Sequence, residues 1–282
     1  MGDPARLTSA GNVPVNAIKK LPTLFIPHGG GPCFFMDPPP AAPHMWDGLA
    51  AYLRGIGASL GVKPKAVLVV SGHWETPLPT LNVSPKPGLL FDYYGFPEHT
   101  YRLKYPAAGA PQLAERVRTL LADAGFDSDV ETKRGLDHGV FVPFLLIYPH
   151  ADVPILQLSL QASLDPALHL ALGRALAPLR EQGVLIVGSG MSYHNLADMF
   201  SGRGAAAAAA FDAWLAEAVR DPATREQLLT TWREAPGGAA SHPREEHLIP
   251  LMVAAGAASG DRGARSFGES IGGKAISGFQ FG

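Results

Sequence analysis

The stretch that decides the fold runs from Ala66 to Trp74 and has the sequence Ala-Val-Leu-Val-Val-Ser-Gly-His-Trp. Its first five residues are apolar and mostly β-branched, which predicts a strand buried on both faces, as in parallel sheets. We expect this strand to end at Ser71-Gly72, directly before His73. Three more short apolar runs have the same character, at residues 24–26, 155–160 and 184–187.

Helical patterns lie between these strands. Apolar spacing predicts helices over residues 46–60 and 111–124, and the alanine-rich stretch 205–219 favours a third. Asp165-Pro166 is a typical helix start, because an N-cap side chain is followed by proline, and this helix is expected to run to Glu181. Strands that alternate with helices predict an α/β fold with a mixed, largely parallel central sheet flanked by helices.

The chain is expected to form one domain after a flexible tail. Residues 1–20 mix glycine, proline, serine and charge without periodicity, which predicts a flexible tail. From residue 21 to residue 282 nothing repeats at a fixed period and no linker divides the sequence, so a single domain is predicted there.

The composition narrows the classes of partner. The chain has 282 residues, 46% of them hydrophobic, and a net charge of −2, so neither nucleic acid nor a membrane is an expected partner. No apolar run approaches the roughly 18 residues of a membrane span. The single cysteine, Cys33, fits a reducing compartment, and we expect a cytoplasmic location. Any metal would be held by histidine or carboxylate side chains, and the oligomeric state is left open.

Three histidines follow buried-strand candidates in glycine-rich sequence: His28, His73 and His194. Ligands of open α/β sheets bind beyond the carboxyl ends of the strands, so three strands can bring three imidazoles to one edge. For any one of them, a hydrogen-bonded loop histidine is the simpler interpretation. That interpretation weakens for all three together, and we predict a metal site at the carboxyl ends of the strands.

Two further histidines have distinctive settings. His138 lies in a turn before the apolar run 140–148, and a mobile loop imidazole there suits a proton donor or acceptor better than a ligand. A turn-capping role is equally compatible with the composition. His247 follows Glu245 and Glu246 at the start of a segment that runs to Ala258, where a charged helix N-terminus is the alternative. The remaining candidates are taken as structural or surface residues: His44, His99, His150 and His169.

Taken in order, several motifs resemble the class III extradiol ring-cleavage dioxygenases, and most closely their single-chain DOPA-dioxygenase-like subgroup. The matching motifs are His-Gly at 28–29, Ser-Gly-His-Trp at 71–74, Asp-Tyr-Tyr-Gly-Phe-Pro at 92–97, Lys-Tyr-Pro at 104–106, Leu-Asp-His-Gly at 136–139, His-Asn-Leu at 194–196 and Glu-His-Leu-Ile-Pro-Leu at 246–251. One departure is His-Gly-Gly-Gly-Pro at 28–32, where the subgroup usually has His-Gly-Ser-Pro.

The resemblance implies an Fe(II) enzyme that inserts both atoms of O2 into a catechol ring, beside the two hydroxyls and not between them. It assigns His28 and His73 as metal ligands and His138 as the acid–base group. His247 is taken as the third ligand, with Glu246 as the carboxylate competitor. His194 is either a fourth ligand or a second proton carrier, and we assign it as a ligand. A neutral all-histidine site also suits zinc, which has no redox chemistry of its own.

Two other functions compete with this one: a zinc-dependent hydrolase, in which an open metal position activates water, and a non-catalytic metal-binding relative of the same fold. The sequence does not identify the substrate. Aromatic candidates for lining a pocket are Tyr93, Tyr94, Phe96 and the run 33–35, and cationic candidates for a substrate carboxylate are Arg102, Lys104 and Arg134.

Overall fold

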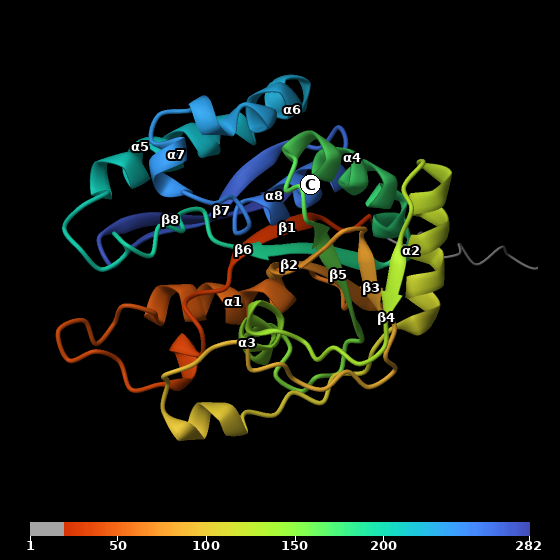
Figure 1. Cartoon of the computed structure of the whole chain (residues 1–282), viewed down its shortest axis with the longest axis horizontal. Coiled ribbons are helices and arrows are strands. Elements are labelled where there is room, and N and C mark those ends of the chain that lie inside the picture. The colour runs from red at the N-terminus through yellow and green to blue at the C-terminus, as the bar shows by residue number, and fades with distance from the viewer. Residues whose placement is uncertain (1–19) are drawn as a thin grey trace, which may run out of the picture.

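Within residues 20–282, which the computed structural model describes, eight strands form one mixed sheet (Figure 1). The strand order is β4-β3-β5-β2-β6-β1-β8-β7. The bounds are β1 (Thr23–Pro27), β2 (Ala66–Thr76), β3 (Thr80–Asn82), β4 (Asp129–Glu131), β5 (Ile155–Gln161), β6 (Val184–Gly190), β7 (Gly263–Ile271) and β8 (Lys274–Phe281). The four central strands, β5, β2, β6 and β1, are parallel, while β3 and β8 pair with them in the antiparallel direction.

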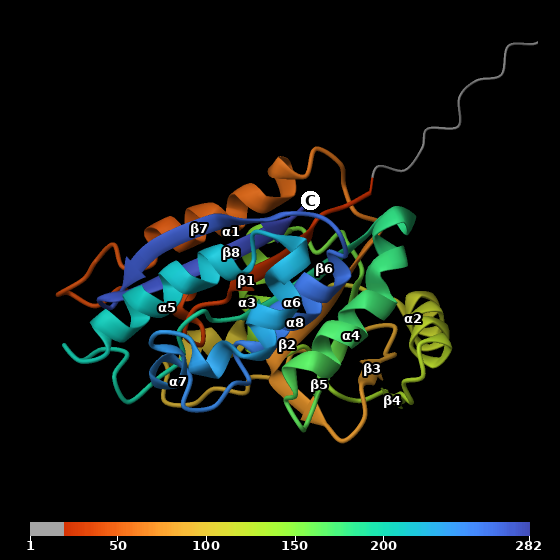
Figure 2. The same cartoon turned by 90° about the horizontal axis from the view of Figure 1, so that it is seen from above.

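Helices cover both faces of this sheet. Their bounds are α1 (Asp47–Ser59), α2 (Pro111–Asp123), α3 (His138–Ile147), α4 (Pro166–Leu176), α5 (Ala205–Ala218), α6 (Pro222–Thr230), α7 (Gly238–Ser241) and α8 (Ile249–Ala257). Figures 1 and 2 show α1 and α3 on one face and α4, α5 and α8 on the other. Short 3-10 helices lie at η1 (Cys33–Phe35), η2 (Glu98–Arg102), η3 (Ala177–Gln182) and η4 (Trp232–Glu234). The predicted single-domain α/β fold with a mixed sheet is confirmed.

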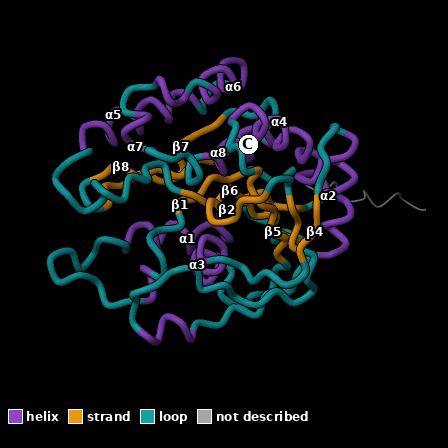
Figure 3. Tube along the Cα trace, in the orientation of Figure 1, coloured by secondary structure: helices purple, strands orange, loops and turns teal. Residues whose placement is uncertain are grey.

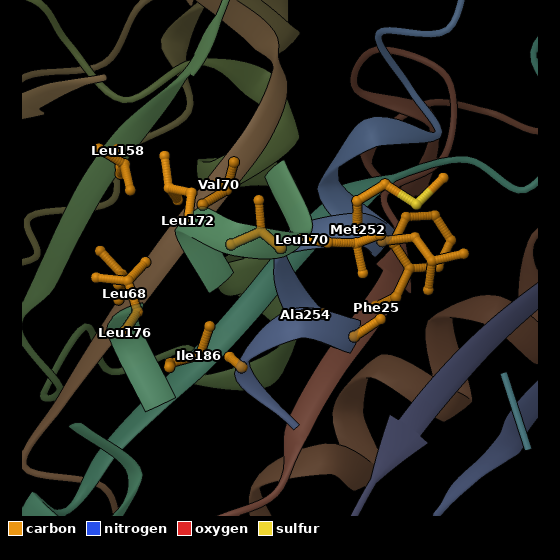
Figure 4. Close-up of a cluster of buried hydrophobic side chains, with 14 of the residues drawn as sticks. Phe25, Leu68, Val70, Leu158, Leu170, Leu172, Leu176, Ile186, Met252 and Ala254 are labelled. Carbon is orange, nitrogen blue, oxygen red and sulfur yellow. The ribbon is translucent and has the colours of Figure 1, made fainter. Parts of the chain in front are cut away.

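The alternation of side chains along each central strand divides the core into two layers. In β2, Leu68 and Val70 point toward α4 and α8, while Val67 and Val69 belong to the layer that includes α1 and α3. Figure 4 shows the first of these layers, in which Leu68 and Val70 lie among side chains of β1, β5, β6, α4 and α8. A strand buried on both faces needs apolar residues at every position, which is why the short apolar runs identified the centre of the sheet.

Long loops lie on the face of the sheet that carries α1 and α3. Figure 3 shows these connections, which join β1 to α1 and β3 to α2. They supply several side chains of the site described below. No helix within the described part of the chain is both long and apolar enough to span a bilayer.

The structure corrects one predicted helix and the alternative interpretation of the segment that begins at Glu245. The helix predicted to run to Glu181 ends as α4 at Leu176, because Pro178 cannot continue it, and the chain goes on as the 3-10 helix η3. The segment beginning at Glu245 is a turn, and α8 starts only at Ile249, with Pro250 in its first turn. The tail predicted for residues 1–20 lies outside the described residues, apart from Lys20.

Candidate active site

Three imidazoles meet at the carboxyl ends of the central strands. His28 follows β1, His73 lies in β2, and His247 lies in the turn before α8. The Nε2 atom of His73 is 3.2 Å from Nε2 of His28 and 3.1 Å from Nε2 of His247. Imidazole nitrogens bound to one divalent metal at about 2.0–2.1 Å lie roughly 3 Å apart, so this arrangement fits a shared ion. We call these three residues the central triad.

Irregular backbone and two glycines bring the central triad together. The pairing of β2 with β5 shifts register between Val70 and Glu75, and such an irregularity redirects the side chains within it, here that of His73. A Cβ on Gly190 would lie 2.1 Å from the carbonyl oxygen of His247, and one on Gly72 would lie 2.9 Å from that of Glu246. Both glycines therefore let the turn that carries His247 rest directly on the ends of β6 and β2.

Hydrogen bonds at Nδ1 orient two rings of the triad. His28 Nδ1 lies 3.1 Å from Ser189 Oγ, and Ser189 itself donates to the carbonyl oxygen of Gly139. His247 Nδ1 lies 2.8 Å from Oε1 of Glu246, which can only accept a hydrogen bond when ionised. Each ring therefore donates from Nδ1 and directs the lone pair of Nε2 toward the centre of the triad.

Burial keeps the central triad neutral. Removal from water lowers the pKa of His28 and of His247 well below the ordinary value, and the neighbouring histidines lower both further. For His73, burial and the proximity of His138 lower the pKa to about 3, although Asp92 opposes the shift. Because a metal binds the neutral imidazole, the three side chains are ready to bind without first losing a proton.

His138 flanks the central triad on the side of His73. Its ring centroid is 3.9 Å from that of His73, and both its backbone N–H and its Nδ1 contact Oδ1 of Asp92, at 2.9 and 2.8 Å. His138 is buried and is the first residue of α3. The expectation of a mobile loop histidine is therefore wrong, because the helix and the Asp92 carboxylate fix both its backbone and its ring.

Asp92 belongs to the long connection between β3 and α2. Burial raises the pKa of the Asp92 carboxyl, but the hydrogen bonds and charge of His138 outweigh this effect, so the net pKa is lowered. Its other oxygen, Oδ2, is 3.8 Å from Nδ1 of His73. Asp92 is thus an ionised carboxylate that orients His138 and also lies near one member of the triad.

His194 flanks the triad on the side of His247. Its ring is stacked on that of His247, with centroids 3.4 Å apart and an angle of 20° between the ring planes. The Nδ1 atom of His194 is 3.1 Å from the same Glu246 oxygen that accepts from His247. Burial raises the pKa of Glu246, but its bond with His194 and the charges of His194 and Arg244 lower the net value.

The structure thus gathers the five predicted site histidines and separates them from the other candidates. Two groups of potential ligands have ligand atoms within 4.8 Å of one another: His28, His73 and His138, and His194, Glu246 and His247. His44, His99 and His150 are exposed, whereas His169 is buried and bonded to the backbone of Gln161 and Asp165.

Several supporting residues had no predicted role. Ser189 and Asp92 orient histidines of the site. Asp137 accepts from Ser71 Oγ at 2.8 Å, and burial raises its pKa. Ser71 Oγ in turn accepts from the backbone N–H of His73 at 3.2 Å, so Asp137 supports the backbone of the site.

The substrate-contact candidates divide clearly. Tyr93 contacts His138 edge to face, with centroids 5.8 Å apart, and also packs against Phe96, whereas Tyr94 is 92% exposed. The Arg134 guanidinium donates to the carbonyl oxygen of His73 and lies over the Trp74 ring, so its position is fixed by protein contacts. Among the residues predicted to contact the substrate, the site geometry therefore supports Tyr93, with Phe96 packed against it.

Comparisons with known proteins identify the family of this chain. Residues 22–279 match the family described as the catalytic LigB subunit of aromatic ring-opening dioxygenase. The chain belongs to this family. The chain is also 48% identical over 199 residues to a 4,5-DOPA dioxygenase extradiol of Beta vulgaris, covering 70% of this chain and 74% of that protein.

Further relatives extend the similarity along the chain. The Escherichia coli K12 4,5-DOPA dioxygenase extradiol is 33% identical over 245 residues, covering 86% of each chain. Dioxygenase tasH of Hapsidospora irregularis is 38% identical over 261 residues, covering 84% of this chain and 78% of that protein. The crystal structure of the uncharacterized Escherichia coli K12 protein JW3007 superposes with a TM-score of 0.72 at 27% identity, covering 93% of this chain and all of that one.

These relationships establish the class of reaction. This LigB-family chain is an extradiol dioxygenase that opens an aromatic ring with O2, and the family depends on a metal. The zinc hydrolase and the non-catalytic relative are the weaker alternatives. The buried histidines could hold such a metal.

Proposed function

We propose that this enzyme opens the ring of a small catechol of the DOPA type in the cytoplasm, with Fe(II) held by His28, His73 and His247. The observation that carries the metal assignment is the position of His73 Nε2, which lies 3.2 Å from Nε2 of His28 and 3.1 Å from Nε2 of His247. Relatives named 4,5-DOPA dioxygenase extradiol support the substrate class. Iron is favoured over zinc because ring opening by O2 needs a metal that exchanges electrons.

The iron, when bound, would supply the binding of diol and O2 together and the transfer of electrons between them. The protein side chains handle protons. His138 donates Nδ1–H to Asp92, so its Nε2 carries a lone pair and can take a proton from a substrate hydroxyl. Tyr93, in edge-to-face contact with His138, offers an aromatic surface beside that proton acceptor.

The stacking of His194 on His247 bears on whether His194 is a fourth ligand. An imidazole binds metal in the plane of its ring, and two nearly parallel planes with centroids 3.4 Å apart do not converge on one ion. We therefore propose the second of the two predicted roles, in which His194 carries a proton on the far side of the triad from His138. Stoichiometric metal in His194→Gln would support this role, and loss of the metal would return His194 to the ligand set.

The function is tested by reconstitution. Purified chain is loaded anaerobically with Fe(II), and a panel of catechols is added with oxygen. We expect oxygen uptake and the yellow ring-opened semialdehyde with iron but not with zinc. Ester or amide hydrolysis by the zinc-loaded chain, without oxygen uptake by the iron-loaded chain, would contradict the proposal.

A further inference from the structure

We propose that Glu246 is a positioning residue that orients two histidines with different tasks, the ligand His247 and the proton carrier His194. One oxygen, Oε1, contacts Nδ1 of His247 at 2.8 Å and Nδ1 of His194 at 3.1 Å. The inference deepens the proposed function and rests on its metal site. It assigns to Glu246 a task other than that of third metal ligand, the position for which Glu246 competes with His247.

The shared oxygen determines where both rings carry their protons. An ionised carboxylate has no hydrogen to donate, so each Nδ1 in contact with it must bear the hydrogen. Each Nε2 is then left with a free lone pair. Both Nδ1 atoms lie against one oxygen, and the two ring planes are nearly parallel, at 20°. One contact thus prepares one nitrogen to bind metal and the other to accept a proton.

The second carboxylate oxygen of Glu246 lies near an arginine. Its second oxygen, Oε2, lies 3.4 Å from Nη1 of Arg244, and the Arg244 guanidinium binds both oxygens of Glu75, at 2.7 and 2.5 Å. Glu75 lies in β2, two residues beyond His73. Through Arg244, these contacts link the strand that carries His73 to the turn that carries His247.

The same contacts argue against Glu246 as a metal ligand. Oε1 already accepts from two rings, and Oε2 faces the Arg244 cation. It is Nε2 of His247, and not a Glu246 oxygen, that lies 3.1 Å from Nε2 of His73. A carboxylate behind a metal-bound histidine raises the basicity of that ligand and fixes its orientation.

The first test is metal affinity, measured on the full chain by competition between the protein and a chromophoric chelator for Zn(II) or Co(II). Glu246→Gln keeps an acceptor oxygen without the charge, and Glu246→Leu removes the acceptor. We expect affinity to fall by about 10-fold for the Gln variant and up to about 100-fold for the Leu variant. Glu245→Gln is the matched control, because that neighbouring carboxylate pairs with Arg233, and it should bind as the wild type does.

Wild-type affinity in both Glu246 variants would overturn the proposal. A circular dichroism spectrum and thermal unfolding of each metal-free variant separate local loss of orientation from misfolding. Because the readout is binding of Zn(II) or Co(II), it holds whether or not the iron-loaded chain opens catechols. Failure of the catechol assay alone would therefore reject the proposed substrate chemistry and leave this inference standing.

The second test needs no substitution. Long-range ¹⁵N–¹H NMR spectra of the zinc-loaded wild-type chain distinguish a histidine protonated at Nδ1 from one protonated at Nε2. We expect both His194 and His247 to carry the proton at Nδ1. A His194 ring with its proton at Nε2, or a loss of that proton pattern from His247, would overturn the shared-oxygen arrangement. In Glu246→Leu the pattern of His194 should change, while Glu245→Gln should keep it.

Discussion

The central triad and the two flanking histidines differ in where their rings lie. His28 directly follows β1, His73 lies in β2 and His247 lies in a turn, and Nε2 of His73 faces Nε2 of each of the other two. The flanking residues, His138 and His194, each lie against one triad member. The Nδ1 atom of each contacts a carboxylate oxygen. The contrast supports the proposed roles, with metal binding in the triad and proton transfer by the flanking histidines.

The carboxylates of Asp92 and Glu246 differ in which histidines they contact. Asp92 Oδ1 holds the ring and the backbone N–H of a single residue, His138. Glu246 Oε1 holds one flanking ring and one ring of the triad. Removing the charge of Asp92 should therefore affect proton transfer alone, whereas removing that of Glu246 should affect metal affinity as well.

Removal of a triad member should have the largest effect. In His28→Ala one of three converging nitrogens is lost, so we expect metal and ring-opening activity to disappear together. Elemental analysis of the purified variant after reconstitution checks the metal, and oxygen uptake checks the activity. His44→Ala, at an exposed position, should retain both. Stoichiometric metal in His28→Ala would show that His28 is not a metal ligand.

Replacing a flanking histidine should leave the metal and abolish most of the chemistry. For His138→Gln we expect stoichiometric iron and a fall in kcat of about 100- to 10,000-fold, the usual contribution of a general acid–base group. The comparison is made at saturating catechol with iron content measured in the same sample. His150→Gln, exposed beyond the end of α3, is the control. Activity that survives in His138→Gln would remove it from the proton-transfer role.

Replacing Asp92, the carboxylate that contacts His138, should reduce activity less than replacing His138 itself. Asp92→Asn keeps the shape of the side chain and loses the charge, so the His138 ring is held more weakly. We expect kcat to fall by about 10- to 100-fold with KM changed much less, and metal affinity close to that of the wild type. Asp92→Glu should recover part of the activity, which a purely structural defect would not predict. A loss of metal affinity as large as in Glu246→Leu would erase the difference between the two carboxylates.

The sequence predicted the centre of the sheet because its strands contain short runs rich in apolar residues. It did not predict the hairpin of β7 and β8, since β7 buries only residues 263, 267 and 271 and so shows no alternation. The start of α8 was also misplaced. Acidic residues favour a helix N-terminus, but the chain becomes helical only at Ile249, directly before Pro250.

The site was predicted as a set of residue types but not as a network. Histidines after buried strands are visible in the sequence, because parallel strands bring their ends to one edge. The pair of His138 and Asp92 is separated by 46 residues, and no local pattern joins them. Likewise, the nearness of Glu246 to His247 in sequence does not reveal that His194 contacts the same oxygen. Orientation of the rings depends on such distant contacts, and so it required the structure.

The smallest expected effect concerns the stability of the metal-free chain, to which the triad contributes. The pKa of His73 is lowered to about 3, and those of His28 and His247 are lowered well below the ordinary value, chiefly by burial. Between these values and about 6.5 the unfolded chain binds more protons than the folded one, so the free energy of unfolding falls as the pH falls. The urea midpoint of metal-free protein should therefore be lower at about pH 5 than at about pH 7.

Substitution and metal should both change this pH dependence. His73→Gln removes one buried group that must become charged on unfolding in acid, so its urea midpoint should vary less with pH, whereas exposed His44→Gln should behave as the wild type. Saturating zinc should raise the midpoint of the wild type at about pH 7, because a ligand that binds the folded state stabilises it. A midpoint that does not change between the two pH values would mean that burial does not hold the triad neutral, and the contrast between centre and edge would then lose its electrostatic basis.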